Sequence, residues 1–368
     1  MDNNQLMCII NQNLGIHKNN CKTFIDFIVA LQKSRTVNLQ QMVNYSSKIG
    51  SIKETSIYKG YQRIVHENKL SQTEIAKCIL TMYDLLDCKL TLAIDRTNWC
   101  YGKKDINLLV LSCCVLDCAI PLYWLELDKN GGCSNNNERQ QLVDRFINDL
   151  GVERIDHIVA DREFVGKSWF NYLNDNKIPF VIRIKQNMVL NKTTSPIKGS
   201  LLFKNATKNT KIQHNIEIDE IPLVAQAVIS PDGEIVIVVS NNSDPTESVD
   251  LLDIYAKRWR IESLFANLKT KGFNFEDTHI TRKDRVGNLT KLIVIAFAVC
   301  YLLGLVRTSV QPIIIKKHGY KQHSFFRHGL DFMIQLFNTN WQQALYVLEL
   351  CFSFMKLEHK TRLLICVM

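Results

Sequence analysis

The sequence predicts an α/β fold in which helices flank a mixed sheet, with a helical region before the sheet and a helical tail after it. Apolar residues recur at helical spacing over residues 21–88. Strand-like and helix-like runs then follow in the order β-β-β-α-β-α-β over residues 90–184, a meander followed by alternating units. Short strand candidates over 186–250 break this alternation and predict a β-rich insertion.

The N-terminal region, residues 1–88, carries the apolar helical spacing of Phe24, Phe27, Ile28 and Leu31. Two segments around a polar stretch, Val37–Val43 and Thr55–Val65, predict short helices. They form either a helix-turn-helix that turns Lys59 and Arg63 toward DNA, or a plain helical bundle with a basic surface. The sequence leaves both interpretations open.

The central region, residues 89–185, is expected to hold the first part of the sheet. Its predicted strands are Leu90–Asp95, Ile106–Leu116, Ile120–Leu127, Ile155–Asp161 and Pro179–Ile184. Helices are expected over Ser134–Leu150, which Gly151 closes, and over Phe164–Asn176. Two of these strands end in an aspartate, and open α/β sheets place their sites at such strand ends.

Three further segments complete the expected organisation. The insertion over 186–250 holds strand candidates at Ile212–Ile218, Leu223–Ile229 and Glu234–Val239. A second part of the core follows over 251–306, and a helical C-terminal region over 307–368. The apolar run Leu289–Val306 contains Lys291 and Gly304 and is at the short limit for a membrane span, so we expect a buried core helix.

Composition favours an ordinary soluble globular protein. The 368 residues are 46% hydrophobic and 22% charged, and the net charge of +9 favours a polyanionic partner. The twelve cysteines lack a Cys-x-x-Cys motif and are expected to be reduced, buried small residues. The N-terminus is polar and lacks a signal-peptide core, so we expect a cytoplasmic protein that does not enter a membrane.

The segment Tyr255–Lys269 carries a carboxylate, two cations and a phenol at suggestive spacing. On one continuous helix, Tyr255, Arg258, Glu262 and Lys269 would project within about 60° of one another. Such a face is either simply solvated or suited to a phosphodiester, with the carboxylate for a divalent metal and the cations for phosphate oxygens.

Three carboxylates in chain order, Asp95, Asp161 and Glu262, are candidates for one site. Converging carboxylates repel one another unless a cation is present, and their oxygens suit hard ions. Two Mg²⁺ or Mn²⁺ ions would catalyse phosphoryl transfer there. In the alternative, a strand-ending aspartate only caps a turn; Glu163 and Asp117 are rival ligands.

At these residues the chain resembles the DDE transposases of insertion sequences, of the insertion-sequence-four type. Tyr255, Arg258, Glu262 and Lys269 match the Tyr-x2-Arg-x3-Glu-x6-Lys signature of that family at every spacing. The two aspartates lie in sequence contexts similar to those of the family, Ile94–Trp99 and Ala160–Phe164. The stretches Ser134–Arg139 and Lys317–Arg327 also resemble stretches of that family. The resemblance covers roughly residues 25–345.

The resemblance implies an RNase H-like fold with a β insertion between Asp161 and Glu262. It implies that Asp95, Asp161 and Glu262 are the catalytic residues and ligate two Mg²⁺ or Mn²⁺ ions. It implies that Tyr255, Arg258 and Lys269 bind DNA near the transposon end. The expected activity is metal-dependent cleavage of double-stranded DNA at terminal inverted repeats and strand transfer to target DNA by a bacterial, nucleoid-associated homodimer. A catalytically silent repressor and a general RNase H-fold nuclease are the alternatives.

One departure from the family concerns the hairpin route. Some relatives hold a flipped base with a tryptophan in the β insertion, but this chain has no tryptophan between Trp169 and Trp259. Phe203 is a weak substitute as a stacking surface. Trp99 and Trp259 are expected to be packing anchors rather than DNA contacts.

Overall fold

The computed structural model describes residues 3–67, 69–128, 132–241, 250–317, 319–353 and 355–366. The chain forms two compact units. The first unites residues 1–87, 99–106 and 265–368, and the second unites residues 88–98 and 107–264. Each unit therefore combines segments that are far apart in the sequence.

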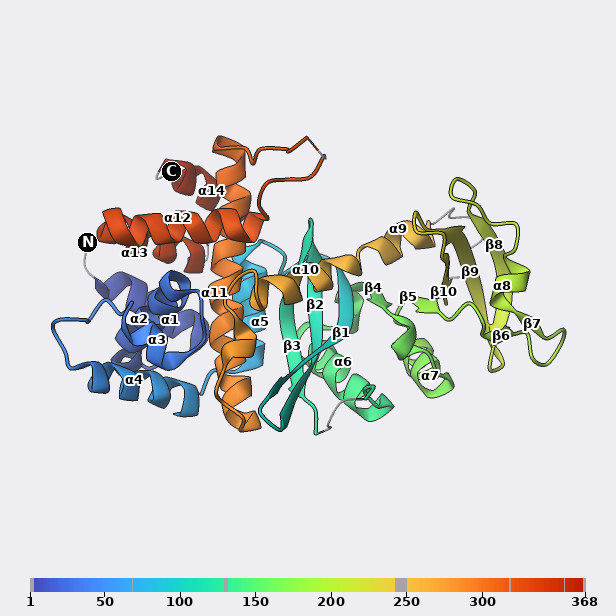
Figure 1. Ribbon diagram of the computed structural model, residues 1–368, viewed down its shortest axis with the longest axis horizontal. Coiled ribbons are helices and arrows are strands. Elements are labelled where there is room, and N and C mark those ends of the chain that lie inside the picture. Colours follow the sequence, from blue (N-terminus) through green and yellow to red (C-terminus); the bar gives the residue numbers. More distant parts are fainter. Residues whose placement is uncertain are drawn as a thin grey trace. The chain divides into compact units, whose positions relative to one another are not determined.

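The second unit is built on a sheet with the strand order β3-β2-β1-β4-β5-β10-β9-β8 (Figure 1). The strands of this sheet are β1 Leu90–Tyr101, β2 Lys104–Val115, β3 Cys118–Glu126, β4 Ile155–Ala160, β5 Phe180–Ile184, β8 Ile212–Ile218, β9 Ile221–Ile229 and β10 Ile235–Ser240. A separate two-stranded ribbon consists of β6 Val189–Leu190 and β7 Ile197–Lys198. The helices around the sheet are α6 Asn136–Leu150, α7 Lys167–Asp175, α8 Gly199–Leu202 and α9 Leu251–Ala256, with short 3₁₀ turns at Val152–Arg154 and Arg162–Phe164.

The pairing pattern confirms the predicted mixed sheet. Strands β2 and β3 pair antiparallel, whereas β4 pairs parallel with β1 on one side and with β5 on the other. Helix α6 packs on β3, and α9 packs across β5 and β10. A three-stranded meander followed by parallel strands is the RNase H-like arrangement that we expected.

The inserted strands extend the same sheet. Strand β10 pairs antiparallel with β5, and β9 and β8 follow it in antiparallel register. Main-chain hydrogen bonding therefore runs without interruption from the core strands into the insertion. The five-segment division of the chain stays a prediction.

Strand β1 differs from the prediction, because it does not end at Asp95. Its parallel ladder with β4 stops at the pair Ile94 and Ala160, but the strand continues to Tyr101. Strand β2 lies on the other side of β1 and runs antiparallel to β3 as a second long hairpin arm. Asp95 thus lies within β1. The neighbouring strand β4 ends at Ala160, whereas β2, the neighbour on the other side, continues beside β1.

The first unit is helical. Its helices are α1 Asn3–Leu14, α2 Lys18–Ser34, α3 Leu39–Val43, α4 Glu54–Glu67, α5 Gln72–Met82, α11 Lys283–Val310, α12 Phe325–Thr339, α13 Trp341–Phe352 and α14 Leu357–Ile365, with a 3₁₀ turn at Phe275–Asp277. Helix α10, Trp259–Leu268, begins in the second unit and ends in the first. The helical regions predicted before and after the sheet are therefore present.

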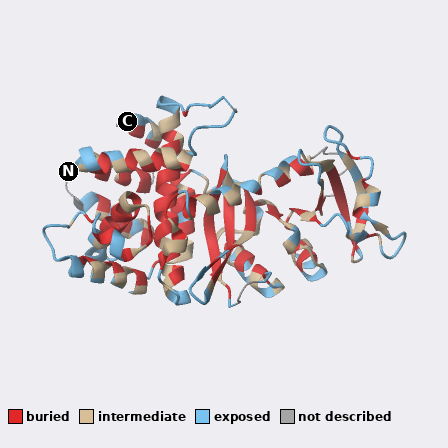
Figure 2. Ribbon diagram, viewed as in Figure 1, coloured by how far each residue is buried: buried red, intermediate tan, exposed pale blue. Residues whose placement is uncertain are grey.

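Helix α11 is the core of the first unit. It is long and apolar enough to cross a membrane by length and composition, but 89% of its most apolar stretch is buried inside the protein. Figure 2 shows this burial along the helix. Helix α12 packs so closely on it that a Cβ on Gly304 would lie 1.7 Å from the Phe325 carbonyl oxygen, and one on Gly329 would lie 1.9 Å from that of Cys300. The core-helix prediction agrees with this packing.

Helices α3 and α4 occupy the positions of the predicted helix pair. Residues 44–53 separate them, whereas a helix-turn-helix has a turn of about three to four residues. Lys59 and Arg63 are exposed on α4. The geometry favours the alternative that the sequence left open, a helical bundle with a basic surface.

The cysteines are all free thiols, as predicted. Burial was predicted too broadly, because Cys8, Cys88, Cys100, Cys133 and Cys366 are exposed. Apolar sequence surroundings identified the buried ones, such as Cys113 and Cys300, but not these.

Candidate active site

The parallel pairing of β1 and β4 brings two candidate carboxylates together. Ile94 pairs with Ala160, and the next residue on each strand is Asp95 and Asp161 respectively. Neighbouring strands lie about 4.8 Å apart, and residues at the same register point to the same face. Residues that are 66 positions apart in the sequence therefore become neighbours at the edge of the parallel ladder.

Both aspartates accept a hydrogen bond from the backbone that follows them. The Arg96 amide donates to Asp95 at 2.8 Å, and the Arg162 amide donates to Asp161 at 2.6 Å. Asp161 thereby caps the short 3₁₀ turn after β4. The capping role considered from the sequence is real, but each cap uses only one oxygen of its carboxylate.

The surroundings of Asp95 disfavour a negative charge. Burial raises the pKa of Asp95 to about 6, against the lowering effects of the Arg96 amide and the Arg258 guanidinium. The nearby carboxylates Glu163 and Asp161 raise this pKa further. Negative charge is therefore concentrated at this sheet edge, where a bound cation would be favoured.

The Tyr255–Lys269 segment is not one helix, so the predicted continuous face is wrong. Helix α9 ends at Ala256 and α10 begins at Trp259. Tight bonds join the two, from the Arg258 amide to the Tyr255 carbonyl at 2.9 Å and from the Ile261 amide to the Arg258 carbonyl at 3.0 Å. This i to i−3 pattern changes the projection of the residues that follow.

Arg258 lies in this break and links two of the carboxylates. Its Nη1 donates to Asp95 Oδ2 at 3.3 Å, and its Nη2 donates to Glu262 Oε1 at 2.6 Å. The arginine is 4% exposed, and its guanidinium lies over the Trp259 ring with Cζ 4.9 Å from the centroid. Its Nε is buried without a hydrogen-bond partner in the described part of the chain. Arg258 thus holds the carboxylate of Glu262 near that of Asp95.

The other two residues of the signature lie in different units. Tyr255 is buried beside Arg258, whose Cζ lies 5.8 Å from the centroid of the tyrosine ring, and burial raises the pKa of Tyr255, as does the nearby charge of Asp161. Lys269 follows α10 in the first unit and pairs with Glu276 at 2.8 Å. The structure therefore brings Asp95, Asp161, Tyr255, Arg258 and Glu262 together within one unit, whereas Lys269 belongs to the other.

A polar network beside the aspartates was missed by sequence reasoning. Arg96 binds the Glu163 carboxylate through Nε and Nη2, at 2.8 to 3.1 Å. Ser134 Oγ donates to the same carboxylate at 3.2 Å, and Arg139 donates to the Glu163 carbonyl oxygen at 3.0 Å. The guanidinium of Arg139 also lies over the Phe164 ring, with Cζ 4.7 Å from the ring centroid. Glu163, a rival metal ligand from the sequence, is the centre of this network.

The sequence contained a signal for this network. Ser134 and Arg139 are the ends of a stretch that resembles the family, and Glu163 lies in the second aspartate context. Only the fold showed that these stretches meet. Asp117, the other rival ligand, is exposed in the turn between β2 and β3.

Comparison with known proteins agrees with this geometry. The Transposase DDE domain family matches residues 88–299, which is more than half of the chain. The chain belongs to this family. It is therefore a DDE transposase, and transposases of this class generally use divalent metal ions.

Other comparisons add little to this assignment. No curated protein matches the transposase sequence. Among the solved structures that match is a cryo-EM structure of the piggyBac transposase synaptic complex with hairpin DNA. It is 11% identical with a TM-score of 0.46, and the match covers 86% of this chain and 70% of that chain.

The donor set of the transposase fits a hard divalent ion. Asp95, Asp161 and Glu262 offer only carboxylate oxygens, which Mg²⁺ and Mn²⁺ prefer. In the described residues, no group of three or more His, Cys, Asp or Glu side chains lies close enough to hold a metal as it stands. Glu262, which Arg258 holds, is the half-exposed member of the set. The ligand chemistry therefore fits, and the side chains need rearrangement to close around an ion.

The aromatic residues singled out from the sequence separate into two kinds, buried and exposed. Trp99 is buried and packs on Phe275 with ring centroids 4.6 Å apart, as expected of an anchor. Trp259 is 56% exposed, so its expected role as a packing anchor is wrong. Phe203 is fully buried against His214, which leaves no open ring face for a flipped base. The structure thus adds to the doubt about a hairpin that the sequence raised.

Proposed function

We propose that the protein is the cut-and-paste transposase of an insertion sequence of the insertion-sequence-four type. It would cleave DNA at the ends of its element and join the 3′-hydroxyl to target DNA. The observation that carries this proposal is the link from Glu262 through Arg258 to Asp95, which is itself beside Asp161. The complete signature at Tyr255–Lys269 supports the subtype.

Three residues would hold the metal in this proposal. Asp95, Asp161 and Glu262 would hold two Mg²⁺ or Mn²⁺ ions, and such ions would supply activation of a nucleophilic oxygen and charge stabilisation for phosphoryl transfer. Asp95 suits this role because burial and its acidic neighbours already disfavour its uncompensated charge. Asp161 contributes the oxygen that its backbone cap does not use.

The remaining residues of the site would position these ligands and the DNA. Arg258 directs Glu262 toward the sheet edge, and the pair of Arg96 with Glu163 fixes the backbone next to both aspartates. Tyr255, Arg258 and Lys269 are proposed to contact the transposon end. Because Arg258 is buried against carboxylates in this structure, its contact with a phosphate would require it to exchange partners.

The partners follow from the same proposal. The substrate is double-stranded DNA bearing terminal inverted repeats, and the net charge of +9 favours such a polyanion. Two ends must be cut together, so we propose a homodimer in the synaptic complex. The cytoplasm of a bacterium, in association with the nucleoid, is the proposed location.

Replacement of Glu262 by Gln tests the catalytic assignment. The variant keeps its size and a hydrogen-bond acceptor for Arg258 but loses the ligand charge. We expect it to lose Mg²⁺-dependent cleavage of end-bearing DNA and to retain end binding in a mobility-shift assay. Glu358→Gln is the matched control, since Glu358 also pairs with an arginine four residues away on a helix, namely Arg362.

The outcomes separate the alternatives. Normal cleavage by the Glu262→Gln variant would show that the residue is not a catalytic ligand. End binding without metal-dependent nicking in the wild type would indicate a silent repressor. Cleavage of DNA that lacks terminal repeats, without strand transfer, would indicate a general nuclease.

A further inference from the structure

A polar cavity in the helical unit lies outside the catalytic residues. Its volume is about 250 Å³, and it is lined by the start of α3, one face of α4, the segment Thr278–Arg282, and Arg285. All of these segments belong to the first compact unit. None of its lining residues is acidic. With about 30 Å³ for each water, the space admits a phosphate group together with several waters.

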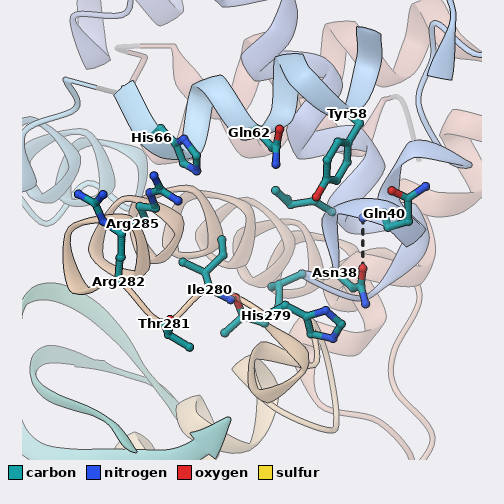
Figure 3. A pocket seen from close by; sticks show the side chains of 13 residues that line it. Asn38, Gln40, Tyr58, Gln62, His66, His279, Ile280, Thr281, Arg282 and Arg285 are labelled. Atoms are coloured by element: carbon teal, nitrogen blue, oxygen red, sulfur yellow. Dashed lines mark hydrogen bonds between the residues drawn. The ribbon is translucent and has the colours of Figure 1, made fainter. Parts of the chain in front are cut away.

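One wall of the cavity is a regular face of α4. Tyr58, Gln62 and His66 are four residues apart, so their side chains lie on one side of the helix. Figure 3 shows these three side chains directed toward the segment that carries Arg282 and Arg285. This wall provides a hydroxyl, an amide and an imidazole as hydrogen-bonding groups.

The opposite wall carries two arginines in different states. Arg282 pairs with Asp284 through Nε at 3.1 Å and Nη2 at 2.9 Å, so part of its charge is compensated. No hydrogen bond or ion pair engages the guanidinium of Arg285 in the described part of the chain, although its charge acts on Asp284 and on His66. His279 completes this wall and lies 3.9 Å from Asp277. Arg285 is therefore the charged donor of the cavity that is available to a ligand.

The electrostatics of His66 agree with a positive cavity. Burial lowers the pKa of His66, and the charges of Arg285 and Arg282 lower it further, against the raising effects of Asp284 and Glu67. A lowered pKa favours the neutral imidazole, which can donate one hydrogen bond. A phosphate oxygen would be attracted by the arginines and could accept hydrogen bonds from the polar groups opposite them.

We propose that this cavity binds one phosphate of the DNA backbone, with Arg285 as the principal ligand and Gln62 and His66 facing it. The proposal rests on the proposed function, because it supplies a DNA contact of the same transposase. It uses a different face of α4 from Lys59 and Arg63, neither of which lines this cavity. The contact is to the backbone, so it stabilises DNA of any sequence.

Arg285→Gln tests the proposal through the salt dependence of DNA binding. With a duplex of arbitrary sequence and no divalent metal, the variant should bind about tenfold more weakly at low salt. The slope of log K against log salt should become shallower by about 0.9, the value for one phosphate contact. Arg362→Gln is the matched control, since it removes the same charge from the same unit at a residue outside the cavity. It should leave the slope unchanged.

A second variant distinguishes loss of the phosphate contact from loss of folding. Gln62→Lys restores a cation on the opposite wall, so the Arg285→Gln/Gln62→Lys double variant should recover most of the affinity and the slope. Equal affinities and slopes for Arg285→Gln and Arg362→Gln would overturn the proposal. So would binding of inorganic phosphate by the wild type together with no effect of Arg285→Gln on DNA, because the cavity would then serve a free anion.

The cleavage assay keeps this inference separate from the proposed function. An effect of Arg285→Gln on DNA affinity without metal-dependent nicking by the wild type would support the cavity and contradict the transposase activity. Normal metal-dependent nicking with no effect of Arg285→Gln on DNA affinity would support the transposase activity and contradict the role of the cavity.

Discussion

The guanidinium of Arg96 grips the carboxylate of Glu163 with two nitrogens, Nε at 2.8 Å from Oε1 and Nη2 at 3.0 Å from Oε2. Arg96 follows Asp95 directly, and Glu163 lies two residues after Asp161. A two-nitrogen pair of this kind fixes both distance and orientation. The ion pair therefore joins the two chain segments that carry the aspartates proposed to be catalytic.

Glu163→Gln should weaken the ion pair between Arg96 and residue 163. The amide offers Arg96 one weak acceptor in place of a carboxylate, so the aspartates lose their fixed spacing. We expect cleavage to fall about 100-fold, the effect of a misplacement near 1 Å. Stability should fall by about 2 kcal/mol, less than for a fully buried pair because both side chains are partly exposed. The Mg²⁺ concentration for half-maximal cleavage is the measurement and should rise.

Glu220→Gln is the control for this experiment, since it breaks the exposed ion pair with Lys167 elsewhere in the same unit. It should change neither the cleavage rate nor the Mg²⁺ concentration for half-maximal cleavage. An unchanged Mg²⁺ requirement in Glu163→Gln would show that the ion pair does not position the ligands.

Arg258→Lys tests the link between Glu262 and Asp95. The arginine reaches the two carboxylates with separate nitrogens, whereas one ammonium group cannot reproduce this geometry. Cleavage should fall about 10- to 100-fold, as for other groups that orient metal ligands. Single-turnover cleavage at saturating DNA gives the measurement. A rate equal to that of the wild type would mean that charge alone, and not the two-nitrogen geometry, matters.

Trp99 and Trp259 should respond oppositely to truncation. Trp99→Ala removes a buried ring and should cost about 3–5 kcal/mol of stability. Trp259→Ala removes an exposed ring and should change stability by less than about 1 kcal/mol. Thermal unfolding measures both. A fall in DNA affinity confined to Trp259→Ala would assign that ring to the DNA, and a large loss of stability in this variant would restore it as an anchor.

Lys360 gives the protein a specific pH dependence. It is fully buried, donates to the carbonyl oxygens of Met82 and Cys351, and burial lowers its pKa. Between this lowered pKa and the ordinary value the unfolded chain binds more protons than the folded one, so stability rises with pH through that window. Below the lowered pKa the full penalty of burying the charge remains.

Lys360→Met isolates this effect, since the variant has no proton to lose. The unfolding midpoint of the wild type relative to the variant should rise as the pH increases toward the ordinary lysine pKa of about 10. A constant difference over this range would show that the pKa of Lys360 is not lowered in the folded protein.

The order of strands and helices could be predicted because it depends on local patterns. The limits of β8 agree with the sequence prediction at both ends, Ile212 and Ile218. The break between α9 and α10 could not be predicted, because the segment Tyr255–Lys269 holds neither Gly nor Pro. Burial of Arg258 between carboxylates accompanies the break, and that contact spans 163 positions of the chain.

For the site, the sequence alone selected the candidate residues. The spacing of the signature and the two aspartate contexts pointed to Asp95, Asp161 and Glu262, because residue type and spacing are local properties. Only the tertiary structure decided how they are held. Parallel register placed the aspartates side by side, Arg258 turned inward to link Glu262 with Asp95, and Arg96 found Glu163 67 positions away. Such pairings depend on which distant segments meet in the sheet, and short-range sequence periodicity does not specify these long-range contacts.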